Sequence, residues 1–358
     1  MQVILGVILH FIGGFASGSF YMPFKKVRKW AWENYWLVGG FFSWLIVPTL
    51  AAWLTVPHFG AIIRATSADT KFWTYLMGVL WGIGGLTYGL GVRYLGMSLG
   101  NSVILGLTAT FGALLPSVYY DFVPHDGKVT FTMLLDNAWG QWVLAGVVVC
   151  LVGIYLCGKA GLMKEKDFKG HAPVDELSAE SKEEFSIGKG LIVAIISGVL
   201  SACFNYGIEA GTPMAQRAVQ MGTNPLFQNN VTYIVLLWGG LTTNFIWCII
   251  LHIKNHTFGD YIDAKTPLAN NYLFAALAGT TWFLQFFFYG MGESKLGNGA
   301  SSWILHMAFI ILTANMWGLV LKEWKGVNRK TLYTIIAGIA AIFIAIMLVG
   351  IGNALKPA

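Results

Sequence analysis

Charged residues make up only 11% of this 358-residue sequence, whereas hydrophobic residues make up 56%. A soluble domain carries about 25% charged residues, because its surface faces water. The apolar residues are gathered in long blocks with almost no charge, such as 191–202, 231–253 and 334–351. With its flanks, each block reaches the roughly 20 residues that cross a hydrocarbon core about 30 Å thick. The sequence therefore predicts an all-α polytopic membrane protein embedded in a lipid bilayer and excludes a soluble one.

Cysteine and cofactor motifs are also scarce. The four cysteines lie inside apolar blocks, so neither disulfides nor a zinc site are expected. His252, His256 and Asp260 have metal-ligand spacing, but they end in a loop after Gly259, so we predict no metal site. No phosphate-binding loop and no acidic loop is visible, so we expect no cofactor, no ATP-driven pumping and no enzyme activity. A membrane-embedded sugar transferase, which would need such a metal-binding loop, is the least favoured alternative.

The apolar blocks predict ten transmembrane helices, at 2–22, 33–56, 72–92, 97–120, 140–158, 189–210, 229–253, 271–292, 300–321 and 331–352. Arg93 and the loops 23–32, 159–189, 254–270 and 322–330 hold 17 of the 23 Lys and Arg residues. Basic loops remain in the cytoplasm, so both termini are expected in the periplasm of a bacterial inner membrane. This placement of charge also argues against nucleic-acid binding. No basic residue precedes the first block, which predicts a retained helix rather than a signal peptide.

A polar segment divides the chain near its midpoint. Residues 159–188 are predicted to be a cytoplasmic linker between two halves, 1–158 and 189–358, with five helices each. Three weak matches relate the halves in the same order: 14–20 with 198–204, 88–96 with 289–297, and 144–158 with 336–350. Because each half has an odd number of helices, the two copies insert in opposite orientations. This is the inverted-repeat plan of secondary transporters, whose substrate site lies near the membrane midplane between the repeats.

Two histidines lie inside apolar helices, where an ionisable side chain is costly to bury. His306 shares a helical face with Ser302 and Thr313, and His10 shares one with Ser17 and Tyr21. A histidine titrates near neutral pH, so it can bind a proton or donate to a sugar hydroxyl. The alternative is a neutral histidine satisfied by a backbone carbonyl.

Two further polar faces are candidates for a substrate site. Asn205 and Glu209 lie one turn apart in the sixth predicted helix, although Glu209 is also placed well for a role at the membrane surface. Trp282, Gln285 and Tyr289 follow i, i+3, i+7 spacing in the eighth. Aromatic rings with an amide between them suit a pyranose, whose C–H face stacks while its hydroxyls need donors and acceptors. Ordinary aromatic packing is the alternative.

The most distinctive strings are FYMPFKKVRKW at 20–30, WGIG at 81–84, RYLGMS at 93–98, LQFFFY at 284–289, WILHM at 303–307 and GLVLKEW at 318–324. They resemble the bacterial L-rhamnose–proton symporter family of the drug/metabolite transporter superfamily. The resemblance implies ten helices in two inverted halves and proton-driven uptake of L-rhamnose or related sugars such as L-lyxose. The sequence departs from the family pattern around Asn205 and Glu209, which favours His306 and His10 as the proton-coupling groups.

The resulting hypothesis is a secondary transporter that works by alternating access. Its predicted substrate-binding residues are Tyr21, Asn205, Trp282, Gln285, Tyr289, Trp303 and His306, and its predicted proton-coupling residues are His306, His10 and Glu209. The sequence leaves sodium coupling open, since carbonyls and hydroxyls can build a sodium site without a signature. A drug or metabolite exporter of the same superfamily is the closest alternative. Such an exporter would bind amphiphiles or cations at a site with little hydrogen-bonding demand.

Overall fold

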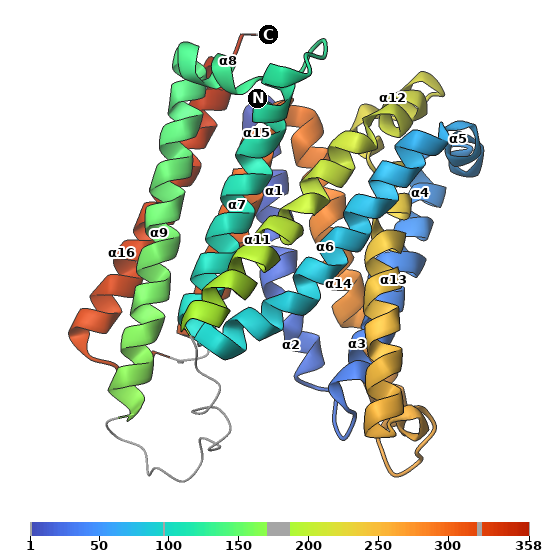
Figure 1. The fold of residues 1–358 in the computed structure, drawn as a ribbon, viewed down its shortest axis with the longest axis vertical. Coiled ribbons are helices and arrows are strands. Elements are labelled where there is room, and N and C mark those ends of the chain that lie inside the picture. The colour runs from blue at the N-terminus through green and yellow to red at the C-terminus, as the bar shows by residue number, and fades with distance from the viewer. Residues whose placement is uncertain (1, 96, 170–186, 321–323, 358) are drawn as a thin grey trace. The chain divides into compact units, whose positions relative to one another are not determined.

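The computed structural model describes residues 2–95, 97–169, 187–320 and 324–357, and these residues form helices and connecting turns without strands (Figure 1). The elements are α1 (Gln2–Ser19), α2 (Tyr21–Phe24), α3 (Trp32–Phe41), the π-helix η1 (Phe42–Ile46), α4 (Val47–Thr55), α5 (Phe59–Ala65), α6 (Ala68–Leu95), α7 (Met97–Phe122), α8 (Phe131–Asp136), α9 (Ala138–Lys169), α11 (Ile187–Ala210), α12 (Thr212–Gln220), the 3-10 helix η2 (Pro225–Phe227), α13 (Asn230–Asn255), the 3-10 helix η3 (Phe258–Tyr261), α14 (Leu268–Leu296), α15 (Gly299–Val320) and α16 (Arg329–Leu355). The all-helical fold class predicted from the sequence is confirmed.

Nine helical segments among the described residues are long and apolar enough to cross a membrane. They correspond to nine of the ten predicted spans. The remaining predicted span, 72–92, lies within α6, whose 28 residues extend about 42 Å at 1.5 Å per residue. Because α6 is not among the nine, the tenth span stays a prediction.

The predicted linker lies largely outside the described residues, which omit 170–186. Its first part is helical, because α9 continues to Lys169 rather than ending at residue 158. Asp167 near the end of α9 accepts hydrogen bonds from the Asn328 backbone N–H (2.9 Å) and the Thr331 hydroxyl (2.6 Å). These contacts cap the start of α16 with a carboxylate, which a helix N-terminus favours.

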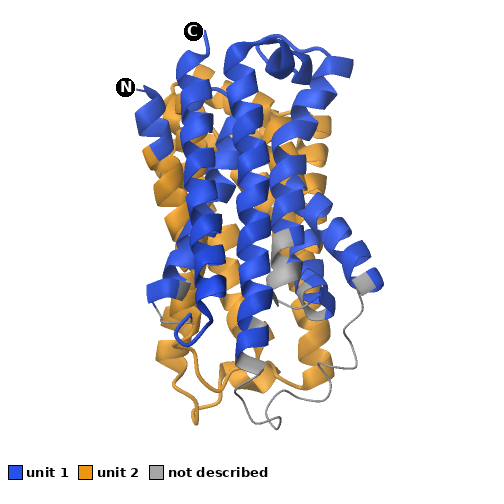
Figure 2. Cartoon of the chain, turned by 90° about the vertical axis from the view of Figure 1, so that its left-hand side faces the viewer, with its two compact units in different colours: residues 1–7, 84–202, 296–358 blue, residues 8–83, 203–295 orange. Residues whose placement is uncertain are grey.

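The described chain divides into two compact units (Figure 2). Unit 1 comprises 1–7, 84–202 and 296–358, and unit 2 comprises 8–83 and 203–295. Each unit therefore takes segments from both predicted halves. Unit 2 combines most of the first three predicted spans with the end of the sixth, the seventh and the eighth, whereas unit 1 holds the fourth, fifth, ninth and tenth. The second and seventh, fourth and ninth, and fifth and tenth predicted spans thus fall in the same unit, whereas the first and sixth are divided differently between the units.

Unit 1 is organised around the long antiparallel pair α9 and α16, which lie side by side (Figure 1). The helices approach closely at Gly153 and Gly338. A Cβ added at Gly153 would lie 3.0 Å from the Gly338 carbonyl oxygen, and one added at Gly338 would lie 3.1 Å from that of Gly153. Small residues of this kind let helix backbones pack in a bilayer, where the hydrophobic effect supplies no force between helices.

Unit 2 contains two matching helix crossings. A Cβ at Gly239 of α13 would lie 2.9 Å from the Gly78 carbonyl carbon of α6, and one at Gly279 of α14 would lie 2.8 Å from that of Gly39 in α3. Each crossing contains a pair of consecutive glycines, Gly39–Gly40 and Gly239–Gly240. The second glycine of each pair packs against a tryptophan ring, Gly40 against Trp44 and Gly240 against Trp81. The spacing of Gly78 and Gly279 is that of Tyr88 and Tyr289 in the predicted repeat. These paired crossings support the inverted repeat, which otherwise stays a prediction.

Candidate functional site

The predicted polar face of α14 lies in the interior of unit 2. Tyr289 is 1% exposed and Gln285 is 4% exposed, while Trp282 is half-buried. The helix spans Leu268–Leu296 without interruption, so the predicted i, i+3, i+7 alignment holds. The Gln285 side-chain nitrogen has no hydrogen-bond partner among the described residues. Since leaving a buried amide donor unsatisfied costs about 1–3 kcal/mol, Gln285 is a good candidate to donate to a ligand.

Tyr289, Asn205 and His10 come together from three helices. The Tyr289 hydroxyl donates to the Asn205 side-chain oxygen at 3.1 Å. The His10 ring meets the Tyr289 ring edge-on, with 5.4 Å between ring centroids. His10 and Asn205 are at most 1% exposed. Gly292 makes room for the imidazole, because a Cβ there would lie 2.7 Å from the His10 Nε2 atom. The structure thus brings together two predicted sugar-binding residues and one predicted coupling residue.

Two carboxylates border this group. Glu209 and Glu293 both interact electrostatically with Tyr289. Glu293 is half-buried and accepts a hydrogen bond of 2.8 Å from the Asn229 side chain. Glu209 was predicted as a coupling group, and its position beside Tyr289 is compatible with that role. Glu293 was missed, because it lies at the end of its apolar block, where a carboxylate usually faces water. Its spacing from Tyr289, one helical turn, is the signal that could have found it.

An aromatic cluster lies next to Trp282 inside unit 2. The Trp81 and Trp282 ring centroids are 5.5 Å apart with their planes tilted by 30°. Phe204 packs edge-on against Trp81 at 5.1 Å, and Phe20 packs edge-on against Trp282 at 6.3 Å. Both pairs occupy equivalent positions in the predicted repeat. Trp81 was noticed only as part of a family string, because a tryptophan among glycines carries no polar pattern of its own.

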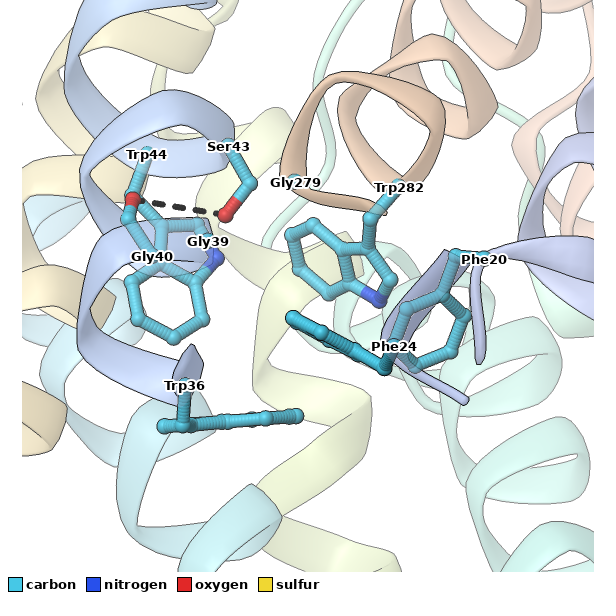
Figure 3. A pocket seen from close by; sticks show the side chains of 9 residues that line it. All are labelled: Phe20, Phe24, Trp36, Gly39, Gly40, Ser43, Trp44, Gly279 and Trp282. Carbon is cyan, nitrogen blue, oxygen red and sulfur yellow. Dashed lines mark hydrogen bonds between the residues drawn. The ribbon is translucent and has the colours of Figure 1, made fainter. Parts of the chain in front are cut away.

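A small cavity borders the cluster and has a volume of about 20 Å³ (Figure 3). Its lining residues are Phe20, Phe24, Trp36, Gly39, Gly40, Ser43, Trp44, Gly279 and Trp282. Figure 3 shows Trp44 and Trp282 on opposite sides of this space. About 10–15 Å³ holds one water molecule, whereas ligand pockets measure roughly 300–1,000 Å³. The aromatic rings therefore fill the site, and they would have to separate to admit a sugar.

Trp44 adds a hydrogen-bond donor to this cavity. Its side chain is 4% exposed, and its indole N–H has no partner among the described residues. Ser43 and Trp44 belong to the π-helix η1, and the Ser43 hydroxyl donates to the Gly40 carbonyl at 3.3 Å. Single π-helical turns within α-helices are rare and often mark functional sites. No sequence pattern predicts this turn, and Trp44 was therefore missed.

Two predicted residues lie in unit 1. Trp303 on α15 is 5% exposed, and its indole N–H donates to the Thr108 carbonyl at 2.9 Å. The ring also packs against Gly112. His306, one turn later, is 2% exposed, and Ser302 on the same face has a buried hydroxyl without a partner among the described residues. The predicted stripe on this helix is therefore buried, while the Trp303 donor is already occupied by the backbone.

Tyr21, the remaining predicted substrate-binding residue, is 49% exposed and starts the short helix α2. Its ring packs on Phe20 at 4.3 Å, beside the aromatic cluster.

A second cavity of about 440 Å³ lies between α7 and α9 in unit 1. Its walls are mostly aliphatic, and the Thr110 hydroxyl there already donates to the Gly106 carbonyl at 2.8 Å, so it offers a sugar few hydrogen bonds. Among the described residues no group of three or more His, Cys, Asp or Glu side chains could hold a metal ion.

The chain matches the model of the L-rhamnose-proton symport protein family (RhaT) over residues 1–355. It is 38% identical over 357 residues to proteins named L-rhamnose-proton symporter from Cronobacter sakazakii, Yersinia pestis and Yersinia pseudotuberculosis, with 98% of each chain covered. A solved structure that covers 96% of both chains has 13% identity and a TM-score of 0.48, a likeness too weak to support a conclusion. With its membrane-spanning helices, the chain is a multi-pass transporter rather than an enzyme, and it belongs to the L-rhamnose-proton symport protein family.

Proposed function

We propose that this chain imports L-rhamnose together with a proton by alternating access. The observation that carries the proposal is the full-length match to L-rhamnose-proton symporters, at 38% identity over 357 residues. The interior of unit 2 supports it, because aromatic rings, an amide without a partner and a Tyr–Asn pair lie within it. Related sugars such as L-lyxose would use the same groups. Sodium would be a second candidate for the coupling ion.

In this proposal Trp282 offers its ring to the apolar face of the sugar, while Gln285 and the Tyr289–Asn205 pair bond its hydroxyls. Tyr21 and Trp303 complete the predicted substrate-binding set, together with His306. Opening the cluster would separate Trp282 from Trp81 and expose the Trp44 N–H as a further donor. The sugar would replace these ring contacts with its own.

Proton coupling in this proposal falls to His306, His10 and Glu209. A coupling ion drives transport only if it binds one conformation more tightly than the other. His10 contacts Tyr289, so its protonation would change the charge beside a sugar-binding hydroxyl. Glu209 interacts with the same tyrosine, which gives these two groups a direct electrostatic connection to the substrate site. His306 lies on a different helix, α15 of unit 1, and would act separately.

We further propose ten spans in two inverted five-helix repeats, 1–158 and 189–358, in the bacterial inner membrane with both termini periplasmic. The clustering of basic residues in alternate loops supports this orientation. Cysteine-accessibility labelling in cells would test it. The cysteine of Lys265→Cys should be labelled only after the membrane is permeabilised. The cysteine of Lys128→Cys should be labelled in intact cells. All four native cysteines are buried or half-buried, which keeps the background low.

The experiment that tests the function is rhamnose uptake into proteoliposomes under an imposed pH gradient. We expect rhamnose accumulation and rhamnose-dependent proton influx. A protein that fails to move rhamnose would refute the cargo, and rhamnose uptake without proton influx would refute the proton as coupling ion. Export of amphiphiles or cations with no sugar transport would favour the exporter alternative. His306→Ala that still accumulates rhamnose against its gradient would remove His306 from the coupling set.

A further inference from the structure

A second buried polar cluster lies in unit 2, far from Tyr289. It joins the start of α3, the end of α13 and η3, at the lower end of these helices in Figure 1. Tyr272 is the residue of α14 that contacts this cluster, because its hydroxyl donates to the Tyr261 carbonyl at 3.0 Å. Tyr272 precedes Tyr289 by 17 residues, or about 25 Å along the helix. The cluster is therefore separate from the proposed sugar site.

The cluster contains a carboxylate and an imidazole that are both buried. Glu33 is 3% exposed and His252 is 0% exposed. The Thr257 hydroxyl bridges them, because it donates to the Glu33 carboxylate at 2.8 Å and lies 2.7 Å from His252 Nδ1. The same carboxylate oxygen accepts from the Asn255 side chain at 2.9 Å. Neither side chain was expected to have a transport role from the sequence.

The hydrogen-bond directions fix how His252 is protonated. The Thr257 hydroxyl donates its only hydrogen to Glu33, so the Thr257 oxygen must accept a hydrogen bond from His252. The His252 Nδ1 atom must therefore carry a hydrogen. The Nε2 atom of His252 lies 3.0 Å from the Tyr261 hydroxyl, and that hydroxyl lies 3.5 Å from the Asn34 carbonyl. When His252 is neutral, Tyr261 donates to Nε2. When Nε2 takes up a proton, it donates to Tyr261, whose hydrogen turns to the Asn34 carbonyl.

Both protonation states of His252 therefore keep a complete set of hydrogen bonds. Tyr261 itself remains neutral, because burial raises the pKa of its hydroxyl above the ordinary value. An ordinary buried histidine loses a hydrogen bond in one state, which fixes its charge. Here the Tyr261 hydroxyl can reverse direction without moving any heavy atom. On proton uptake, Tyr261 passes its hydroxyl proton to Nε2 while its oxygen takes a proton from water, and release reverses both transfers.

Local charges and helix dipoles favour the charged forms of both side chains. Glu33 lies in the first turn of α3 and His252 lies in the last turn of α13. The dipoles of these helix ends stabilise a carboxylate and an imidazolium respectively, each by about 0.3–1 kcal/mol and up to roughly 2 kcal/mol when partly buried. Burial acts in the opposite direction and favours the neutral imidazole. The helix dipole and the charge of Glu33 thus oppose the effect of burial on His252.

Other titratable groups surround the pair on every packed element. They are Tyr35 on α3, Cys248 and Lys254 on α13, His256 at its end, Asp260 and Tyr261 on η3 and Tyr272 on α14. Asp260 adds a second negative charge that favours a charged His252. The nearby cations, Lys254 on α13 and Lys29 and Lys265 on the adjoining loops, are exposed and screened by solvent.

We propose that His252, bridged by Thr257 to Glu33, is a proton-binding site of the transport cycle. This inference rests on the proposed rhamnose–proton symport and adds a site at the end of unit 2 that the loop charges place towards the cytoplasm. Protons would be exchanged there through Tyr261, at the side on which a symporter must release them. His10 and Glu209 lie beside the proposed sugar site, whereas His252 lies near the side of the membrane on which the proton would be released.

The test compares His252→Gln with His256→Asn in proteoliposomes. His256 is an exposed neighbour with φ +56°, a conformation that asparagine tolerates, so its substitution is a matched control. Two assays are needed: counterflow of labelled L-rhamnose without a gradient, and accumulation under a pH difference of about one unit. One proton per sugar allows at most about tenfold accumulation under that gradient. Counterflow requires no net proton release.

We expect His252→Gln to keep counterflow within about twofold of wild type while accumulation falls from the roughly tenfold limit towards onefold. Rhamnose-dependent proton influx, followed with a pH-sensitive dye, should also be lost. His256→Asn should behave as wild type. Accumulation by His252→Gln at the wild-type level would overturn the proposal. An equal loss of counterflow and accumulation in a folded His252→Gln protein would also overturn it, since that result indicates a structural role.

A second variant covers the case in which His252→Gln does not fold. Thr257→Val removes the bridging hydroxyl at nearly constant volume and leaves His252 and Glu33 in place. Rhamnose binding, followed by tryptophan fluorescence in detergent, should depend on pH in the range where histidine titrates, and Thr257→Val should shift that dependence. An unchanged pH profile in Thr257→Val would refute the site. If wild-type protein moves no rhamnose at all, the proposed function fails first, and the two failures are thereby distinguished.

Discussion

The helix crossing at Gly78 allows a quantitative test of the packing in unit 2. A Cβ added there would lie 2.9 Å from the Leu236 carbonyl carbon, closer still to its oxygen, and 3.2 Å from the Gly239 Cα atom. Ordinary van der Waals contact begins near 3.4 Å, and every one of these atoms is backbone. No rotamer change can relieve the clash, so α6 and α13 would have to separate. Overpacking of this kind costs about 1–3 kcal/mol and sometimes more.

Gly85 provides the control within the same helix. It is exposed, and no heavy atom would lie within 4 Å of an added Cβ. Alanine is a better helix former than glycine by up to about 1 kcal/mol, so Gly85→Ala should leave stability unchanged or slightly higher. A destabilisation of about 1–3 kcal/mol corresponds to a fall in Tm of roughly 2–12 °C for Gly78→Ala.

The assay is thermal unfolding of both purified variants in the same detergent, with counterflow measured in parallel. Gly279→Ala should repeat the effect of Gly78→Ala, because it clashes with the Gly39 backbone at the equivalent crossing. Equal Tm values for Gly78→Ala and Gly85→Ala would show that α6 and α13 do not pack as described. A large effect at Gly78 but none at Gly279 would refute the equivalence of the two crossings.

Three other predictions concern single side chains. Tyr289→Phe removes the hydrogen bond to Asn205 and should weaken rhamnose binding by about 0.5–1.5 kcal/mol, or roughly twofold to tenfold in Kd, measured by fluorescence titration; unchanged affinity would place the sugar elsewhere. Trp282→Ala removes a ring that contacts four aromatic side chains and should abolish saturable rhamnose uptake. Trp53→Ala, at a side chain that is 67% exposed, is the control and should leave uptake intact. Equal uptake by both variants would contradict the proposed site. Asp167→Ala removes the carboxylate that caps α16 and should lower stability by about 0.5–2 kcal/mol in thermal unfolding without changing rhamnose affinity; a lower affinity would indicate coupling to the substrate site.

The sequence was sufficient to predict the helical fold and the shared helical face of three residues in the proposed site. Long apolar blocks predict membrane helices because a bilayer imposes length and hydrophobicity on every span. The i, i+3, i+7 spacing of Trp282, Gln285 and Tyr289 predicts a shared face because the helical period is fixed. The tertiary neighbours of that face, His10 and Asn205, were candidates only because each is a polar residue in an apolar block.

Other functional candidates could be found only from the three-dimensional structure. Trp44 lies in a π-helical turn, and its buried indole N–H without a partner among the described residues is visible only in the folded chain. Glu33 and His252 are more than 200 residues apart in sequence, and each lies near the end of an apolar block. At such positions a charged residue ordinarily reaches water. Their burial depends on the turn that follows α13, where Thr257 returns to Glu33.

The proposed repeat divides the residues of unit 2 into two classes. Trp81 with Trp282, Phe20 with Phe204 and Gly78 with Gly279 are the same residue type in both copies, and each of them packs rings or backbones. Several polar residues of the proposed site differ between copies, although Tyr289 corresponds to Tyr88. At the repeat spacing, His10 corresponds to Ala194, Asn205 to Tyr21 and Gln285 to Gly84.

This division follows from what alternating access demands of a duplicated chain. Both halves must adopt each other's conformation in turn, so the packing that supports the motion has to be present twice. A single asymmetric sugar and a single proton need only one set of partners, and a second set would compete for them. Polar residues in only one copy are therefore the expected mark of the substrate site. At the spacing of the two glycine pairs, His252 corresponds to Ala52, so it too is polar in only one copy, as expected of a residue that binds a ligand.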